Sequence, residues 1–125
     1  MSNLCQEITL PTDPIQHIDG DGEIALCILS AINVGKLTSL DQLDELCELA
    51  VRGLDALIDY QHYPVKAAEQ STKNRRSLGI GFIGLAHYLA KNGVKYEDRE
   101  AWKLVHDLTE AVSYTHLTLP TIYSV

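Results

Sequence analysis

The sequence has little that would suit a membrane, an exported protein or a nucleic-acid partner. No apolar run approaches the ~20 residues that a membrane-spanning helix needs, and Met1 to Glu7 lack the basic start and apolar stretch of a signal peptide. Lysine and arginine together number 10 against 17 aspartate and glutamate residues, which gives a net charge of −7. A negative net charge disfavours a protein that binds nucleic acid mainly through contacts with its phosphate groups. We therefore expect a cytoplasmic protein that binds neither a membrane nor DNA.

Cysteine is also scarce. The three cysteines, at positions 5, 27 and 47, are widely spaced and form no Cys-x-x-Cys pair. A structural zinc site needs about four ligands, which usually arrive as closely spaced pairs, and a disulfide scaffold needs an oxidising compartment. The sequence therefore predicts no metal site and no disulfide framework. Each cysteine is then either a reactive thiol or a small apolar side chain, and we expect Cys47, on an apolar helical stripe, to be the latter.

The rest of the composition is typical of one small globular domain, since 46% of the 125 residues are apolar and 22% are charged. The continuous apolar run at 24–32 predicts a strand buried on both faces, as in a parallel sheet, although a buried helix has the same periodicity. Ser39, with Gln42 as its capping-box partner, predicts the start of a helix that ends near Tyr60. Its apolar residues recur at three- and four-residue steps: Leu43, Leu46, Cys47, Ala50, Leu54, Leu57 and Ile58.

Two further helices are expected beyond the basic residues Lys73, Arg75 and Arg76. Residues 78–91 predict one that ends at Asn92-Gly93. The other begins near Glu97, with Trp102, Val105 and Leu108 on one side.

The last fourteen residues, 112–125, change character because they contain no charged residue and lose the helical pattern. Residues 112–121 resemble the translation of a transposase-type sequencing-library adapter. We therefore predict a domain at residues 1–111 and a non-native tail at 112–125.

Gly79, Gly81 and Gly84 satisfy the Gly-x-Gly-x-x-Gly dinucleotide fingerprint. The fingerprint needs an apolar strand leading into its first glycine, and residues 70–77 are polar and basic. We interpret the glycines as positions where a helix packs closely on a neighbour, and keep a dinucleotide-binding oxidoreductase as an alternative. The acidic turn at 17–23 places Ile28 where a calcium loop needs glutamate, and the five histidines show no metal-ligand spacing.

An amide, a thiol and a carboxylate alternate near the N-terminus, at Asn3, Cys5 and Glu7. Side chains of an extended segment point to alternate sides, so these three would face one spot. They offer a hydrogen-bonding group, a redox-capable sulfur and a proton acceptor. A polar edge with a chance cysteine has the same pattern, so the spacing alone leaves both interpretations open.

A longer set of residues resembles the large subunit of class I ribonucleotide reductase. The matching blocks cover nearly everything between Ser2 and Ala111, in order: Ser2-Asn3-Leu4-Cys5, Glu7-Ile8, Leu10-Pro11-Thr12, Gly22 to Cys27, Leu29-Ser30-Ala31, Asn33, Gly35, Ala50-Val51-Arg52, Leu54 to Leu57, Asp59-Tyr60, Tyr63-Pro64, Arg75 to Gly81 and Tyr88 to Lys91. Leu4 stands where the cobalamin-dependent class usually has proline, which favours the class I diphosphate reductases. The resemblance implies an α/β fold: part of the family's ten-stranded α/β barrel, mostly helical after one or two strands.

The resemblance also implies a radical reduction of ribonucleoside diphosphates to 2′-deoxyribonucleoside diphosphates. Cys5 matches the cysteine that becomes a thiyl radical, Glu7 the general base on the 3′ hydroxyl, and Asn3 the residue that hydrogen-bonds the substrate. Substrate would bind along Asn3, Leu4, Cys5, Gln6 and Glu7. Cys27 matches one thiol of the redox-active pair that supplies electrons.

Several family parts have no counterpart in these 125 residues: the second thiol of the pair, the ATP and deoxynucleotide effector regions, the radical-relay tyrosines and the C-terminal shuttle cysteines. We therefore expect an internal fragment of a homodimeric enzyme, inactive alone, with no cofactor or metal of its own. The implied partners are the metal-containing small (beta) subunit, which supplies the radical, and thioredoxin or glutaredoxin. A non-catalytic helical interaction module, resting on the stripe through Leu54, is the other alternative.

Overall fold

The computed structural model describes residues 9–17, 20 and 22–122. Their elements follow in the order β1 (Ile28–Asn33), a 3₁₀ turn η1 (Val34–Lys36), α1 (Gln42–Tyr60), α2 (Lys66–Arg75), β2 (Leu78–Ile83), α3 (Leu85–Lys91) and α4 (Arg99–Ile122). The chain divides into two compact units: unit 1 is residues 1–29 with 53–79, and unit 2 is residues 30–52 with 80–125. Among the helices of the described part, none combines the length and the apolar character needed to cross a membrane.

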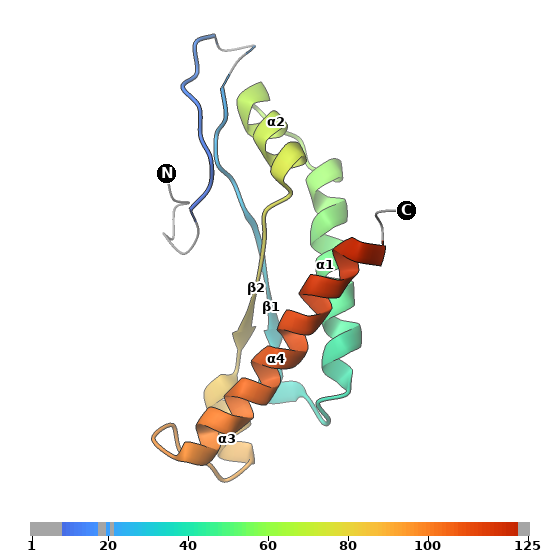
Figure 1. Cartoon of the computed structure of the whole chain (residues 1–125). Helices are drawn as coiled ribbons and strands as arrows, with labels where there is room; N and C mark the ends of the chain where they lie inside the picture. Colours follow the sequence, from blue (N-terminus) through green and yellow to red (C-terminus); the bar gives the residue numbers. More distant parts are fainter. Residues whose placement is uncertain (1–8, 18–19, 21, 123–125) are drawn as a thin grey trace. The chain divides into compact units, whose positions relative to one another are not determined.

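The two strands pair with each other and run in the same direction (Figure 1). β1 confirms the strand predicted within the apolar run, but it begins at Ile28 rather than at Ile24. The earlier residues have other partners: the Ile24 N–H donates a hydrogen bond to the Ala67 carbonyl at 3.4 Å. This part of the run therefore packs on α2 before the strand ladder starts.

The helix predicted at residues 78–91 is wrong over its first half, because Leu78–Ile83 is the strand β2. The strand is close to its neighbour at Gly79, where an added Cβ would lie 2.6 Å from Leu29 Cδ2. The helix α3 begins only after Gly84, whose φ of +77° suits glycine. Its predicted end is confirmed, since α3 stops at Lys91 and is followed by Asn92 and by Gly93 at φ +71°.

The helix α1 confirms the predicted element and its end at Tyr60. The predicted capping box is wrong in its pairing. Gln42 Oε1 accepts hydrogen bonds from the N–H and the hydroxyl of Thr38, both at 3.0 Å, while Ser39 Oγ accepts from the Asp41 N–H at 3.2 Å. The side-chain cap is therefore built one residue earlier than the Ser39–Gln42 pattern predicts.

The apolar stripe of α1 is narrower than predicted. Leu43 and Cys47 are buried in unit 2, and Leu54 and Ile58 are buried in unit 1. Other apolar side chains of this helix are exposed by 38–89%: Leu46, Leu49, Leu57 and Tyr60. The helix α1 therefore leaves several large apolar side chains exposed.

The helix α2 was not predicted, because it has no large apolar residue to produce a periodic pattern. Its buried side chains are small: Ala67, Ala68, Ser71 and Thr72. Small side chains let a helix lie close to its neighbours without a hydrophobic stripe, so pattern-based prediction misses it.

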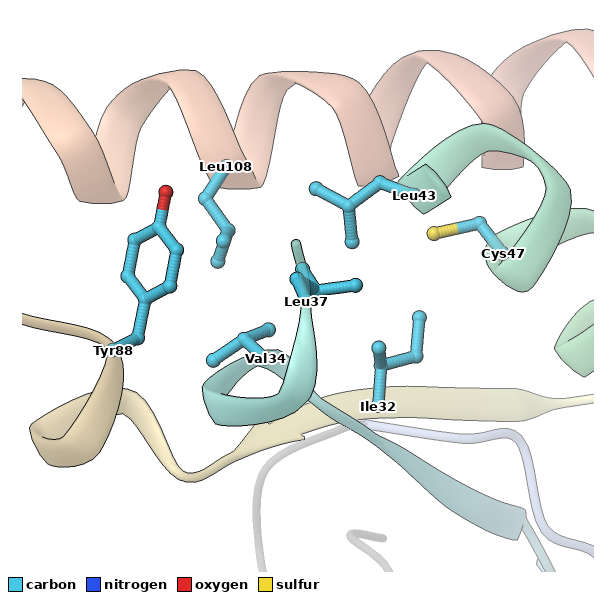
Figure 2. Packing of buried hydrophobic residues seen from close by; sticks show 7 residues of the cluster. All are labelled: Ile32, Val34, Leu37, Leu43, Cys47, Tyr88 and Leu108. Carbon is cyan, nitrogen blue, oxygen red and sulfur yellow. The ribbon is translucent and has the colours of Figure 1, made fainter. Parts of the chain in front are cut away.

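The core of unit 2 joins both strand ends to helices α1, α3 and α4 (Figure 2). Its buried residues are Ile32, Val34, Leu37, Leu43, Cys47, Tyr88 and Leu108. On α4, Leu108 is fully buried as expected, but Trp102 is 67% exposed, and Ala101 takes the buried position instead. The expected loss of helix at Val112 is also wrong, since α4 runs to Ile122.

Candidate functional site

Of the six residues that sequence analysis assigned to the active site, five lie outside the described residues: Asn3, Leu4, Cys5, Gln6 and Glu7. Their predicted roles therefore stay predictions. Cys27 is described, and the site is built here from the segment that carries it, residues 22–28, which we call the Cys27 segment.

Cys27 is half-buried and lies directly before β1. The N–H of the next residue, Ile28, donates a hydrogen bond to the Ser77 carbonyl at 3.1 Å. Ser77 in turn lies directly before β2. The thiol is thus carried at the point where the two strands begin their pairing, rather than on a free loop.

The other end of the Cys27 segment is held by α2 and by residue 13. Glu23 exchanges two backbone hydrogen bonds with Asp13, at 3.1 and 3.2 Å. Its carboxylate accepts from Arg75 Nη2, at 2.7 Å to Oε2 and 3.0 Å to Oε1. Ile24 is bound to Ala67, as described above. The segment therefore has anchors on both sides of Cys27, and most of them come from α2 and the residues that follow it.

Arg76 directly follows α2 as its C-terminal cap and binds two aspartates of α1. Its Nε donates to Asp55 Oδ1 at 2.6 Å, and its Nη2 donates to the Asp55 carbonyl at 2.9 Å. The carboxylate of Asp59 accepts two further hydrogen bonds from Arg76, from Nη1 to Oδ1 at 3.1 Å and from Nη2 to Oδ2 at 3.0 Å. Asp55 and Asp59 are one helical turn apart, so both carboxylates face the same guanidinium.

These contacts change the acid–base behaviour of the paired groups. The hydrogen bond from Arg76, followed by its charge, holds the pKa of Asp59 below its ordinary value. The two aspartates raise the pKa of Arg76, so the guanidinium stays charged at any accessible pH. On α2, the hydrogen bond from Lys73 likewise lowers the pKa of Glu69. The basic residues near the end of α2 are therefore paired with carboxylates and do not form an open anion-binding patch.

Comparison with known proteins identifies the family. A sequence model described as "Ribonucleotide reductase, barrel domain" matches residues 1–119. The chain belongs to the ribonucleotide reductase family. It is 63% identical over 114 residues to the ribonucleoside-diphosphate reductase subunit alpha of Haemophilus influenzae. Identity is 55% to the ribonucleoside-diphosphate reductase 1 subunit alpha of Escherichia coli K12, over 114 residues, and 46% to the alpha subunit of Enterobacteria phage T4, over 115 residues.

These matches cover 90% of the chain but only 15% of each relative. The chain is therefore a part of the ribonucleotide reductase barrel domain, with one pair of parallel strands and four α-helices among the described residues. This confirms the expected fold class. The division into residues 1–111 and a tail at 112–125 stays a prediction.

Within the ribonucleotide reductase barrel, the glycines of the 79–84 segment do not have the geometry of a dinucleotide fingerprint. That fingerprint ends its strand before the first glycine and opens a helix on the phosphate. Here Gly79 and Gly81 lie inside β2, and only Gly84 precedes a helix. The close-packing interpretation holds for Gly79 and Gly84, where an added Cβ would lie 2.6 Å from Leu29 and 2.7 Å from Asn33 Oδ1. The packing element at Gly79 is a strand, however, and not the helix that was expected.

Cys47 confirms its predicted place in the core, with 1% of its surface exposed. Burial, followed by the charge of Asp44, raises the pKa of its thiol. A neutral, shielded thiol is a poor nucleophile, so Cys47 serves packing and Cys27 is the better placed of the two for chemistry.

Sequence analysis missed two groupings. The first is the Arg76 contact with α1, whose only sequence signal is the spacing of Asp55 and Asp59. The second is on α4, where single ligand atoms of His106, Asp107 and Glu110 all lie within 4.8 Å of one another. His106 and Glu110 are more than 70% exposed, and such groups are common on helix surfaces without a metal ion.

Proposed function

We propose that this chain carries part of the active site of a ribonucleoside-diphosphate reductase alpha subunit. The observation that carries the proposal is the barrel-domain match over residues 1–119, together with 63% identity to an alpha subunit of that name. The reaction is the reduction of a ribonucleoside diphosphate to the 2′-deoxyribonucleoside diphosphate. Two thiols are oxidised to one disulfide, and the 2′ hydroxyl leaves as water, so atoms and electrons balance.

Each site residue has one role in this proposal. Cys5, as a thiyl radical, takes the hydrogen atom from the 3′ carbon and returns it at the end of the cycle. Glu7 accepts the proton of the 3′ hydroxyl during the step, and Asn3 hydrogen-bonds the substrate beside Leu4 and Gln6. Cys27 is one thiol of the pair that reduces the 2′ carbon. The anchored, half-buried position of Cys27 supports this role, because a reductant thiol must meet the substrate in a fixed geometry.

The remaining parts come from outside these residues. The proposal includes a small beta subunit that supplies the radical, and thioredoxin or glutaredoxin that restores the dithiol by disulfide exchange. In this proposal the second thiol, the nucleotide effector sites and the contact between alpha subunits lie in other parts of a full-length subunit, because the chain spans only 15% of the Haemophilus influenzae relative. Localisation in the cytoplasm is part of the same proposal.

The test uses a hybrid alpha subunit, in which the 114-residue segment matched in the Haemophilus influenzae relative is replaced by the corresponding residues of this chain. Deoxynucleotide formation is measured with the beta subunit and thioredoxin. We expect Cys5→Ser to abolish the reaction and Cys27→Ser to permit at most one turnover. Cys47→Ala is the matched control, because this cysteine is buried in the core of unit 2 and has no role in the proposed reaction, and it should keep repeated turnover.

Repeated turnover by the Cys5→Ser hybrid would refute the proposed radical site. The 125-residue chain alone should form no deoxynucleotide under the same conditions. Turnover by the isolated chain would contradict the view that it is only part of the enzyme.

A further inference from the structure

The structure ties the backbone beside Cys27 to a charged contact on α1. We propose that Arg76 is a positioning residue for the Cys27 thiol, which it controls through Ser77 and the Ile28 amide. This inference rests on the proposed function of Cys27, and it adds a residue to which sequence analysis gave no role.

Arg76 is firmly held against α1. Its guanidinium makes four hydrogen bonds, two to Asp55 and two to Asp59, at 2.6–3.1 Å. The planar, rigid fork of an arginine makes such paired hydrogen bonds geometrically specific. One of the four bonds goes to a backbone carbonyl of α1, so the contact fixes Arg76 to the helix itself and not only to mobile side chains.

The backbone of Arg76 lies in the left-handed region, at φ 47° and ψ 46°. Arg76 is the only non-glycine residue with a positive φ among the residues that the structure describes. Its N–H still caps α2 by donating to the Thr72 carbonyl at 2.8 Å. A glycine would adopt this conformation with less strain. The left-handed backbone of Arg76 costs free energy, and the four hydrogen bonds between its side chain and α1 offset that cost.

The backbone connects Arg76 to the thiol. The residue after Arg76 is Ser77, whose carbonyl accepts the Ile28 N–H at 3.1 Å. That N–H belongs to the peptide group whose other end is the Cα of Cys27. Because a peptide group is planar and rigid, a shift of the Ser77 carbonyl carries the Cys27 Cα with it. The Ile28 N–H and the Cys27 Cα lie in the same peptide plane. The ψ torsion of Cys27 is the only backbone rotation between this plane and the Cys27 side chain.

The other end of the Cys27 segment is held by contacts that do not use the Arg76 guanidinium. Arg75 holds the Glu23 carboxylate, and Ala67 accepts the Ile24 amide. With this end held, loss of the Arg76 contact would release the Ser77 end alone. We therefore expect a small displacement of the thiol and not its loss from the site. A reacting group misplaced by about 1 Å can lose about 100-fold in rate.

The experiment uses the hybrid alpha subunit described above. Arg76→Gly removes the guanidinium, and glycine adopts the left-handed backbone without strain, so this variant tests the loss of the four hydrogen bonds to Asp55 and Asp59 without an added backbone cost. Arg76→Lys keeps the charge but loses the fork. Arg52→Ala is the matched control, because Arg52 also pairs with an acidic residue one turn away on α1, Glu48 at 2.6 Å, at an exposed site. Rates are expressed per folded molecule, with the folded fraction measured by circular dichroism.

We expect Arg76→Gly to lower kcat at least tenfold with KM within about twofold of the parent. It should also raise the amount of substrate consumed per deoxynucleotide formed, because a displaced Cys27 would fail to reduce a substrate radical already generated. Arg76→Lys should lie between Arg76→Gly and the parent, and Arg52→Ala should match the parent in all three quantities. A purely structural arginine would change the folded fraction but leave the consumption ratio at its parent value.

Parent-like kcat and consumption ratio in Arg76→Gly would overturn the proposal. If Arg76→Gly does not fold, Arg76→Lys decides: a threefold or larger fall in kcat supports a positioning role, and an unchanged kcat refutes it. The Cys27→Ser hybrid separates the two levels of inference. Repeated turnover by Cys27→Ser would refute the proposed role of Cys27 itself, whereas loss of turnover there with a parent-like Arg76→Gly would refute only the positioning role.

Discussion

Replacing Leu108 with alanine tests the packing of α4 against the core of unit 2. The Leu108 side chain is fully buried among Val34, Leu37, Leu43 and Tyr88 (Figure 2). Removal of its Cγ and both Cδ carbons costs about 2.4 kcal/mol in transfer free energy, at ~0.8 kcal/mol per methylene. The cavity that remains raises the expected loss of unfolding free energy to about 2.7–5 kcal/mol. At a denaturant slope of roughly 2 kcal/mol per molar urea, the unfolding midpoint should fall by about 1.4–2.5 M.

The matched control is Trp102→Ala on the same helix. Trp102 is larger than Leu108 but 67% exposed, so its loss should change the free energy of unfolding by no more than about 0.5 kcal/mol. Both variants are measured by urea titration of the 125-residue chain, followed by circular dichroism. The sequence pattern alone would place Trp102 and Leu108 on the same buried side. Equal losses for the two variants, or a larger loss for Trp102→Ala, would refute the orientation of α4 argued here.

Two further outcomes follow from the described contacts. Alkylation of Cys47 by iodoacetamide, followed by peptide mass spectrometry, should be at least about 100-fold slower in the native chain than in urea, because burial shields the thiol and raises its pKa; equal rates would contradict the core position. Hydrogen bonds from Arg76 and Lys73 lower the pKa values of Asp59 and Glu69. The two ionised carboxylates therefore stabilise the fold above about pH 5, and this stabilisation is lost as the pH falls through the lowered pKa values. The urea midpoint should therefore decline between about pH 5 and 3, less steeply in Asp59→Asn, and an unchanged slope in that variant would count against the ion pair.

The sequence predicted those elements whose signal is local. The helix α1 shows a strong apolar stripe and a clear end, and both its existence and its end near Tyr60 are confirmed. The turn at Asn92-Gly93 was found because glycine at a helix end is a local requirement. The resemblance to ribonucleotide reductase rested on many matched blocks in order, and the family match bears it out.

The strand β2 could not be predicted in the same way, because its reason for being a strand lies far away in the chain. A parallel strand is stabilised by a partner reached through a long crossover, here β1 across the whole of α1 and α2. Within the Leu-Gly-Ile-Gly-Phe-Ile sequence, two glycines hide the alternation that would mark a strand. Gly79 is needed because it leaves room for the Leu29 side chain, and no local sequence pattern reveals this contact.

The candidate site shows the same division between residue type and position. The role proposed for Cys27 rests on its residue type and on the resemblance to ribonucleotide reductase, whereas its placement depends on contacts that are distant in sequence. Arg75 reaches Glu23 across 52 positions, and Arg76 reaches Asp55 across 21. Adjacent arginines at the end of one helix thus hold both the far end of the Cys27 segment and the start of β2. A charged pair that would contribute little to stability on an open surface can then matter for catalysis, because a reacting thiol is sensitive to displacements too small to unfold the chain.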